Sequence, residues 1–199
     1  MSIKSLENHT GCPGEKLDPR VVRTRQLLQK ALKELLGEGR FSEITVQDIT
    51  ERATVNRATF YAHFEDKYAL LEDMLASDLR NALIARIQPG SPFDHSHVRT
   101  FAMAVIEFLG NIHSGCTHKR EFGPLLDTTM QGTVQEFLTM WMSHAPDSDL
   151  KRGQSNEIVA TVFSWAFYGA GMRWAREAKR PPLEAFTDDV MATLSLSPL

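Results

Sequence analysis

Two short helical patterns joined by a turn of about three residues constrain this chain more than any other feature of its sequence. The stretch from Ile44 to Phe64 reads ITVQDITERATVNRATFYAHF. Thr45 and Asp48, three residues apart, form the pattern of a capping box and so predict the start of a helix. After a short break, Asn56 is a second good N-cap residue. The stretch therefore predicts a helix, a tight turn and a second helix.

Each of the two helices has one apolar side. In the first, Val46, Ile49 and Ala53 fall on one face. In the second, Phe60 and Phe64 are four residues apart and give that helix a side to bury. The opposite side of the second helix is left for the surface.

That outward side carries a cation, hydroxyl groups, an imidazole and two small residues, namely Arg57, Ala58, Thr59, Tyr61, Ala62 and His63. An arginine can bond to both acceptors of a guanine, alanine and threonine methyl groups can contact a thymine methyl, and hydroxyl groups can bond to phosphates. The surface suits the major groove of DNA. From periodicity alone, an ordinary pair of helices with a polar outer face explains the pattern equally well.

A resemblance to a known family decides between these two interpretations. The run from Leu27 to Leu71 resembles the DNA-binding module of the TetR family of bacterial transcription regulators. The matching pieces, in order, are Thr45-Val46-Gln47-Asp48-Ile49, Thr59-Phe60-Tyr61-Ala62-His63-Phe64, and Lys67 followed by Leu70 and Leu71. The resemblance implies an all-α fold, in which an N-terminal three-helix DNA-binding domain with a helix-turn-helix precedes a larger helical domain for ligand binding and dimerisation.

The chain departs from the family at the bend between the two helices, where the family usually has glycine and this sequence has Thr54. If the bend requires a positive φ, a β-branched residue is strained there.

The resemblance also implies which residues contact DNA. Phosphate contacts are expected from Thr45, Tyr61 and Lys67, and Asn56 is expected to serve both as a helix cap and as a neighbour of a phosphate. Contacts to base edges are expected from Arg57, Ala58, Thr59 and His63. For His63, a solvent-exposed or locally hydrogen-bonded imidazole is an equally good alternative.

We expect three parts in the chain: an N-terminal extension over residues 1–17, the helix-turn-helix domain over 18–66, and the helical ligand-binding and dimerisation domain over 67–199. In the last part, breaks at Pro and Gly predict helices over about 66–87, 95–113, 119–130, 133–143, 155–178 and up to 195.

The net charge of −3 argues at first sight against a nucleic-acid partner. The distribution of charge does not, because residues 18–70 hold nine Lys and Arg against eight Asp and Glu, whereas 71–199 hold eleven against fifteen. Five cations precede the first acid of the expected first helix, and we expect them to face the DNA backbone: Arg20, Arg23, Arg25, Lys30 and Lys33.

The helix expected near residues 155–178 has a wider apolar surface than one packed face requires. A stripe of it is expected to meet a second subunit, namely Val159, Val162, Ala166, Gly169 and Arg173. The alternative is a central helix surrounded by its own chain. Family members commonly pair through their last two helices, which implies a homodimer whose two helix-turn-helix domains bind two half-sites one DNA turn apart.

Family members typically bind a small molecule among the C-terminal helices. Candidate pocket residues are Phe101, Phe108, Met130, Phe137, Trp141 and Phe163, although aromatic and Met residues at helical spacing more often form plain core. A metal site at His113, Cys116, His118 and Glu121 is less expected than a solvated loop, since a clear fourth ligand is missing. We expect no metal and no cofactor.

No catalytic motif supports an enzyme. A family-like protein that binds another protein in place of DNA is the closer alternative, but it would have no reason to retain Arg57, Tyr61 and Lys67. Two cysteines, no apolar leader and no apolar stretch of about 20 residues favour a cytoplasmic protein that does not enter a membrane. We therefore expect a homodimeric repressor that binds operator DNA and is released by a small-molecule effector, with repression resting on the family alone.

Overall fold

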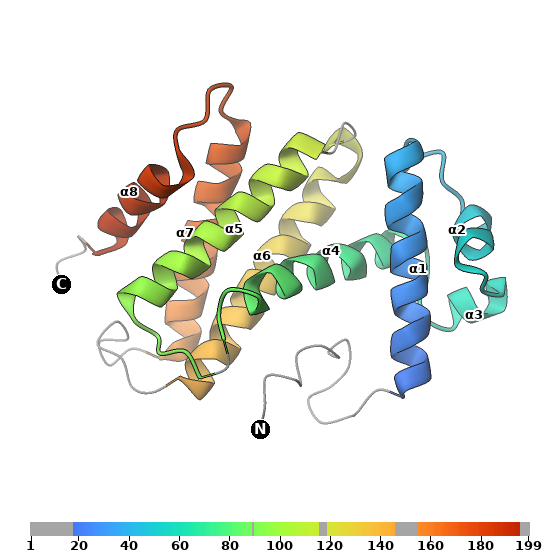
Figure 1. The fold of residues 1–199 in the computed structure, drawn as a ribbon, viewed down its shortest axis with the longest axis horizontal. Coiled ribbons are helices and arrows are strands. Elements are labelled where there is room, and N and C mark those ends of the chain that lie inside the picture. The colour runs from blue at the N-terminus through green and yellow to red at the C-terminus, as the bar shows by residue number, and fades with distance from the viewer. Residues whose placement is uncertain (1–17, 89, 116–118, 146–154, 196–199) are drawn as a thin grey trace. The chain divides into compact units, whose positions relative to one another are not determined.

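The structure, a computed structural model, describes residues 18–88, 90–115, 119–145 and 155–195, and these contain eight α-helices and no strand (Figure 1). The all-α fold expected from the sequence is confirmed. The helices are α1 (Pro19–Glu38), α2 (Val46–Ala53), α3 (Arg57–Tyr61), α4 (Lys67–Ile84), α5 (His95–Gly115), α6 (Lys119–His144), α7 (Asn156–Arg176) and α8 (Leu183–Ser195).

The chain divides into two compact units between Ser77 and Asp78, inside α4, with only residues 120–122 of the later part grouped with the first unit. The sequence-based boundary was placed earlier, between residues 66 and 67. The difference arises because the first half of α4 bonds to α1: the Gln29 amide nitrogen donates to Asp73 Oδ2 over 2.7 Å and to Ser77 Oγ over 3.2 Å.

The first unit is built around one buried side of α1. Leu28, Ala31 and Leu32 on that side are 0–2% exposed. Helix α2 packs on α1, and the short helix α3 packs on α2 (Figure 1). Burial of one apolar stripe therefore gathers the helices that form the expected helix-turn-helix.

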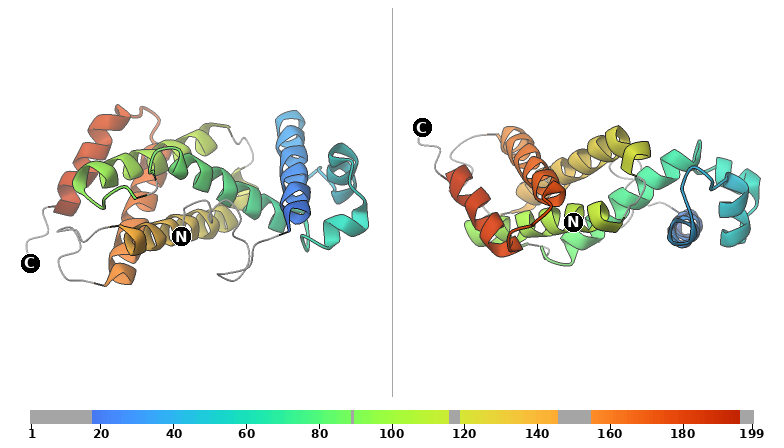
Figure 2. Two further views of the ribbon diagram at one scale, coloured as in Figure 1. Left: turned by 60° about the horizontal axis from the view of Figure 1, so that its bottom comes forward. Right: turned by 90° about the horizontal axis from the view of Figure 1, so that it is seen from above.

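In the second unit, α5 lies beside α7 and also packs on α8 (Figures 1 and 2). The close approach of α5 to α7 depends on two glycines. A Cβ atom added at Gly171 of α7 would lie 2.6 Å from Leu109 Cδ1 and 3.3 Å from the backbone Cα of Ile106. A Cβ at Gly110 of α5 would lie 2.4 Å from the Trp174 ring. Larger side chains at these positions would force the two helices apart.

Aromatic rings fill the core of the second unit. The Phe101 ring lies 5.6 Å from Phe137 and 5.8 Å from Trp141, and Phe93 lies 5.0 Å from Trp141. Four of the six candidate pocket residues are almost completely buried, namely Phe101, Met130, Phe137 and Trp141. The other two, Phe108 and Phe163, are half-buried. Their mutual contacts are those of a packed core.

Helix α6 runs without a break from residue 119 to residue 144, which corrects the expectation of two helices separated near Gly132. Its middle is held by side chains. Gln131 donates to Gln135 Oε1 over 3.1 Å and to Ser164 Oγ of α7 over 3.2 Å, and Gln135 donates to Thr161 Oγ1 over 3.2 Å. The bonds to Ser164 and Thr161 join α6 to α7 on either side of Gly132, a residue whose low helix propensity would by itself weaken α6.

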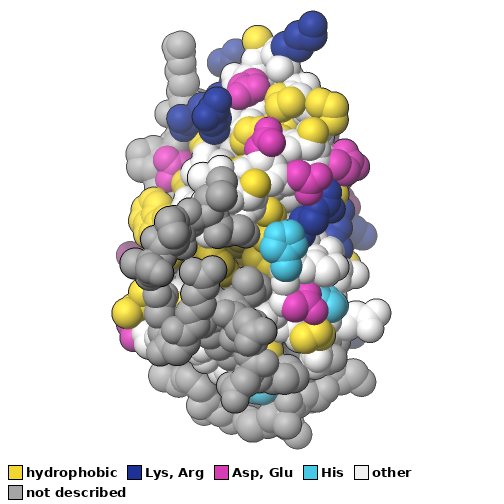
Figure 3. Space-filling model, turned by 90° about the vertical axis from the view of Figure 1, so that its left-hand side faces the viewer, with side chains coloured by type: hydrophobic (Ala, Val, Ile, Leu, Met, Phe, Trp, Pro, Cys, Tyr) yellow, Lys and Arg dark blue, Asp and Glu magenta, His cyan; other side chains and the backbone are white. Residues whose placement is uncertain are grey.

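Figure 3 shows the face along α8, where cations, acids and histidines are interspersed with apolar side chains. Arg99 of α5 donates to Asp188 of α8 over 2.5 Å. Within the described ranges, no helix is long and apolar enough to cross a bilayer, and no group of three or more His, Cys, Asp or Glu is arranged to hold a metal ion. Residues 1–17, Cys116 and His118 lie outside the described residues.

The surroundings of Gly171 and of Gly132 predict opposite effects when each glycine is replaced by alanine. Gly171→Ala should destabilise the fold by about 1–3 kcal/mol, because the new methyl group collides with Leu109 and with the α5 backbone. Gly132→Ala is the matched control, since nothing lies within 4 Å of its added Cβ, and it should stabilise by roughly 0.5–1 kcal/mol through helix propensity. Urea unfolding of both variants measures the difference, and equal midpoints for Gly171→Ala and the wild type would contradict the packing argument.

Candidate nucleic-acid interface

The capping box at the start of α2 is confirmed. The Asp48 backbone N–H donates to Thr45 Oγ1 over 3.2 Å, and the Thr45 backbone N–H donates to Asp48 Oδ2 over 2.8 Å. The Thr45 hydroxyl also donates to Asp48 Oδ2, over 2.8 Å. These hydrogen bonds, the backbone one first, hold the pKa of Asp48 below its ordinary value. The Thr45 hydroxyl proton therefore has a partner within the protein before any phosphate arrives.

The turn after α2 places Thr54 in the left-handed region, with φ 54° and ψ 46°. Among the described non-glycine residues it is the only one with a positive φ. The next backbone N–H, of Val55, donates to the Thr50 carbonyl over 2.9 Å and closes the end of the helix. The strain expected for Thr54 is therefore present at the bend.

Helix α3 has only five residues and is held by its neighbours. As expected, Asn56 caps it, accepting from the Ala58 backbone N–H over 2.8 Å. The expected buried side is also confirmed, because Phe60 is 0% and Phe64 4% exposed. The regular helix ends at Tyr61, and backbone bonds from His63 and Phe64 to the Phe60 carbonyl continue the turn.

Four residues of the expected outward side are exposed: Arg57, Ala58 and Tyr61 on α3, and Ala62 directly after it. The Arg57 guanidinium donates to the Tyr61 hydroxyl over 3.3 Å and lies 5.6 Å from the centre of its ring. The cation and the phenol thus form one polar group on the surface. Thr59 and His63 are half-buried beside them.

The imidazole of His63 is neutral at neutral pH. Burial, and then the positive charge of Arg25, hold its pKa below the ordinary 6.5. A neutral imidazole adds no charge to a phosphate contact, but it can still donate or accept a hydrogen bond.

Four of the five cations expected to face DNA from α1 are exposed: Arg20, Arg23, Lys30 and Lys33. Arg25 is different, and the expectation for it was wrong. Its guanidinium donates to Asp73 Oδ1 over 2.8 Å and lies 4.6 Å from the centre of the Phe64 ring. Its charge is directed into the first unit.

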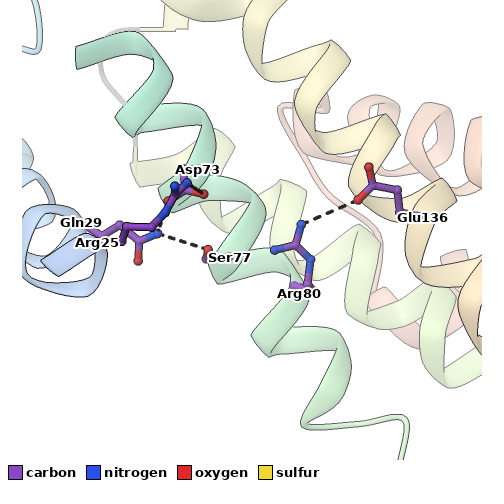
Figure 4. Close-up of polar contacts among 6 residues, drawn as sticks. All are labelled: Arg25, Gln29, Asp73, Ser77, Arg80 and Glu136. Carbon is purple, nitrogen blue, oxygen red and sulfur yellow. Dashed lines mark hydrogen bonds and ion pairs between the residues drawn. The ribbon is translucent and has the colours of Figure 1, made fainter. Parts of the chain in front are cut away.

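A polar cluster on α1 and α4, which the sequence did not reveal, surrounds Asp73 (Figure 4). Arg25 and Gln29 of α1 both donate to the Asp73 carboxylate, and Ser77 accepts a second bond from Gln29. A buried carboxylate requires such partners. The one sign of this cluster in the sequence is that Asp73 lies between Leu71 and Met74, on a stripe that is otherwise apolar.

Figure 4 also shows Arg80, further along α4 and in the second unit, with its guanidinium 3.7 Å from the carboxylate of Glu136 on α6. The two halves of α4 thus each form an ion pair within their own unit.

A second arginine joins α2 to α1. Both terminal nitrogens of Arg52 donate to the Glu38 carboxylate, each over 2.8 Å, and Glu34 lies 3.6 Å from the same guanidinium. The two-pronged hydrogen bond from Arg52 lowers the pKa of Glu38. This cation is therefore also directed to a protein partner.

Lys67, at the start of α4, has a different environment from the one expected. Its Nζ donates to the carbonyl oxygens of Phe41 over 2.8 Å, Ser42 over 3.2 Å and Ile44 over 2.6 Å. It also lies 4.6 Å from the centre of the Phe41 ring. Three carbonyls take the three N–H donors of an ammonium group. The ammonium is thus held by the protein's own backbone, and the phosphate contact expected of this residue stays a prediction.

Comparisons with known proteins agree with this arrangement of helices. Residues 28–74 match the family described as bacterial regulatory proteins, tetR family. A TetR-family transcriptional regulator from Pectobacterium atrosepticum has the same fold, with a TM-score of 0.56 at 18% identity over 91% of this chain and 95% of that one. The HTH-type transcriptional repressor DhaR of Mycobacterium sp. (strain GP1) is 26% identical over 85% of this chain and 91% of DhaR. The chain is thus similar to TetR-family regulators, through the family match over residues 28–74 and through DhaR over most of its length.

A further relative matches over a shorter stretch of the chain. An uncharacterized HTH-type transcriptional regulator of Bacillus subtilis, YxbF, is 45% identical over 69 residues, which are 32% of this chain and 18% of YxbF. The chain therefore spans less than a fifth of that relative, and about nine-tenths of DhaR. The match of residues 28–74 to a family of bacterial regulatory proteins and the similarity to the repressor DhaR support a DNA-binding transcriptional regulator.

The left-handed Thr54 predicts that removing its side chain stabilises the TetR-like reading head. Thr54→Gly should raise the free energy of unfolding by about 1 kcal/mol, because glycine adopts a positive φ without a steric penalty. Thr54→Ala is the matched control, since it removes the branch but keeps Cβ. Thermal unfolding should rank glycine above alanine, and the reverse order would mean that the turn is not strained by Cβ.

Proposed function

We propose that the protein is a homodimeric repressor that binds a two-fold operator through α3 and releases it when a small molecule binds the second unit. The observation that carries this proposal is the exposed set on α3, namely Arg57, Ala58 and Tyr61, on a helix capped by Asn56 and buried through Phe60. A short exposed helix that presents an arginine and two small residues fits the major groove and its base edges.

Direct readout falls mainly to Arg57 in this proposal. It is the one long cation on the outer side of α3, and its guanidinium is exposed beside the Tyr61 hydroxyl. Ala58 and Ala62 allow the backbone to approach the groove closely. The exposed cations of α1 and the hydroxyl of Tyr61 supply phosphate contacts, which position α3 without reading sequence.

The dimer is supported by an exposed apolar stripe on α7. Ile158, Val162 and Trp165 are 58%, 53% and 59% exposed, and Gly169 and Arg173 continue the same side of the helix. Large apolar side chains left together on a surface favour a protein partner, and a second copy offers the same stripe. Val159 does not belong to the stripe, because it is 5% exposed and faces its own chain, and Ala166 is half-buried at the edge.

Repression is proposed because DhaR, named a transcriptional repressor, is similar in sequence over 85% of this chain. An effector would act within the aromatic core. Since Phe101, Phe137 and Trp141 pack on one another, a bound molecule must displace them, which favours a small apolar or aromatic compound. A repressor that binds operator DNA works in the cytoplasm.

The operator itself is the first test. Footprinting of genomic fragments with the purified protein should reveal a protected two-fold sequence. Arg57→Ala should then cost about 1–3 kcal/mol of discrimination at one base pair of each half-site and leave binding to the other positions unchanged. Arg20→Ala is the control, since loss of a phosphate contact weakens all sequences alike. Identical base preferences for Arg57→Ala and the wild type would remove Arg57 from the reading role.

The α7 stripe predicts a loss of dimers on introducing a charge. Val162→Glu places carboxylates against each other at the two-fold interface, so it should give monomers by analytical ultracentrifugation and weaken operator binding by roughly 10²-fold or more. Asn111→Glu, at an exposed position of α5, adds the same charge away from the stripe and should leave the dimer intact. Dimers of Val162→Glu that bind the operator normally would place the interface elsewhere.

A further inference from the structure

Lys67 joins two parts of the chain that are far apart in sequence. Its bond to the Ile44 carbonyl links positions separated by 23 residues, with α2, the strained turn and α3 lying between them. The segment from 44 to 67 is therefore a closed loop whose two ends meet at one ammonium group. Closing a flexible loop removes conformational freedom from everything inside it.

The contacts of Lys67 are concentrated just before the first helix of the motif. Phe41, Ser42 and Ile44, whose carbonyls accept from Nζ, precede the Thr45 cap of α2. The Phe41 side chain is 1% exposed and lies edge-on to the Tyr68 ring, with 5.2 Å between centroids. The same connection is thus held to the start of α4 by its backbone and by its ring, and the point where α2 begins is fixed.

The other end of the loop is fixed equally closely. Lys67 follows Asp66, which caps α4 by accepting from the Tyr68 and Ala69 backbone N–H groups, each over 2.8 Å. It comes three residues after Phe64, the buried residue that ends the turn of α3. A displacement of the ammonium would shift the start of α2 and the end of α3 relative to each other.

A lysine suits this position better than an arginine. The ammonium is compact, and its three donors point in three directions, as three carbonyls around one point require. A guanidinium is planar, and its donors form a rigid fork suited to carboxylates and phosphates. The arrangement therefore depends on the shape of the cation as well as on its charge.

We propose that Lys67 is a positioning residue for DNA reading: by closing the 44–67 loop onto three backbone carbonyls it sets the orientation of α3. This inference rests on the proposed DNA-binding function. It assigns to Lys67 a role beyond the phosphate contact that the sequence implied.

Two variants of Lys67 distinguish a role in positioning α3 from a role in phosphate contact. Lys67→Arg keeps the positive charge and so would preserve a phosphate contact, but it cannot match three carbonyls. Lys67→Met keeps the length of the stem and removes the charge. Lys30→Met is the control, because this α1 lysine is exposed and its removal changes the net charge equally without touching the loop. Binding of each variant to the operator and to unrelated DNA of equal length is measured over a series of salt concentrations, at a temperature where circular dichroism shows full helix content.

Positioning predicts that Lys67→Arg and Lys67→Met both lose preference for operator over unrelated DNA, on the order of tenfold, although Lys67→Arg keeps the positive charge. Lys30→Met should keep its preference. A Lys67→Arg variant with normal preference would overturn the proposal. So would a salt slope that falls by about one unit in Lys67→Met with preference retained, because that is the signature of a lost phosphate contact.

Hydrogen exchange without DNA tests the closed loop itself. Amide protons of residues 44–49 should exchange on the order of tenfold faster in both Lys67 variants, with those at the centre of α1 unchanged. Unchanged exchange at 44–49 would overturn the proposal even if DNA binding fell. If the wild-type protein showed no preference for any DNA, the proposed function would fail, and the exchange result would still decide whether Lys67 closes the loop.

Discussion

A recognition helix of five residues cannot hold its own shape or position, and this constraint explains most of the first unit. An isolated helix needs roughly 12–15 residues to be even marginally stable in water, so α3 depends on its surroundings. Asn56 satisfies its first backbone groups and Phe60 buries its inner side. Arg25 lies against Phe64 at its end. Asn56 and Phe60 belong to α3 itself, whereas Arg25 comes from α1, and α3 as a whole packs on α2.

The local features of the helix-turn-helix could be predicted from the sequence, whereas the contacts that orient it could not. The capping box at Thr45, the cap at Asn56 and the burial of Phe60 are set by residues within four positions of one another, so spacing alone reveals them. Arg25 and Lys67 were both expected to face DNA. Their partners, Asp73 and the carbonyls of 41–44, lie 48 and 23–26 residues away in sequence, and a cation gives no sign of which acceptor it will meet.

For the second unit, prediction from the sequence is limited in a different way. Its aromatic residues were identified correctly as apolar and helical, but periodicity does not distinguish a ring that packs on another ring from one that lines a cavity. The same limit applies to α7, where apolar residues cover most of the helix. Adjacent positions on a helix differ by about 100°, so placing the exposed stripe on Val159 instead of Ile158 turns it toward the core. Only the packing of α5 on α7 decides which side remains open.

The nearly balanced charge of residues 18–70 has to be considered together with the partners that its Lys and Arg side chains have within the protein. Among the nine Lys and Arg between residues 18 and 70, Arg25, Arg52 and Lys67 bond to partners outside their own helices: Arg25 to Asp73, Arg52 to Glu38 and Lys67 to backbone carbonyls. These three fix α2, α3 and α4 in place, and they contribute little to the attraction of DNA. The exposed cations that remain are few for a partner as highly charged as a duplex, and affinity rises with the number of phosphates neutralised. A single helix-turn-helix domain of this kind would bind weakly, and the dimer that we propose through the exposed stripe on α7 would hold two of them together on one operator.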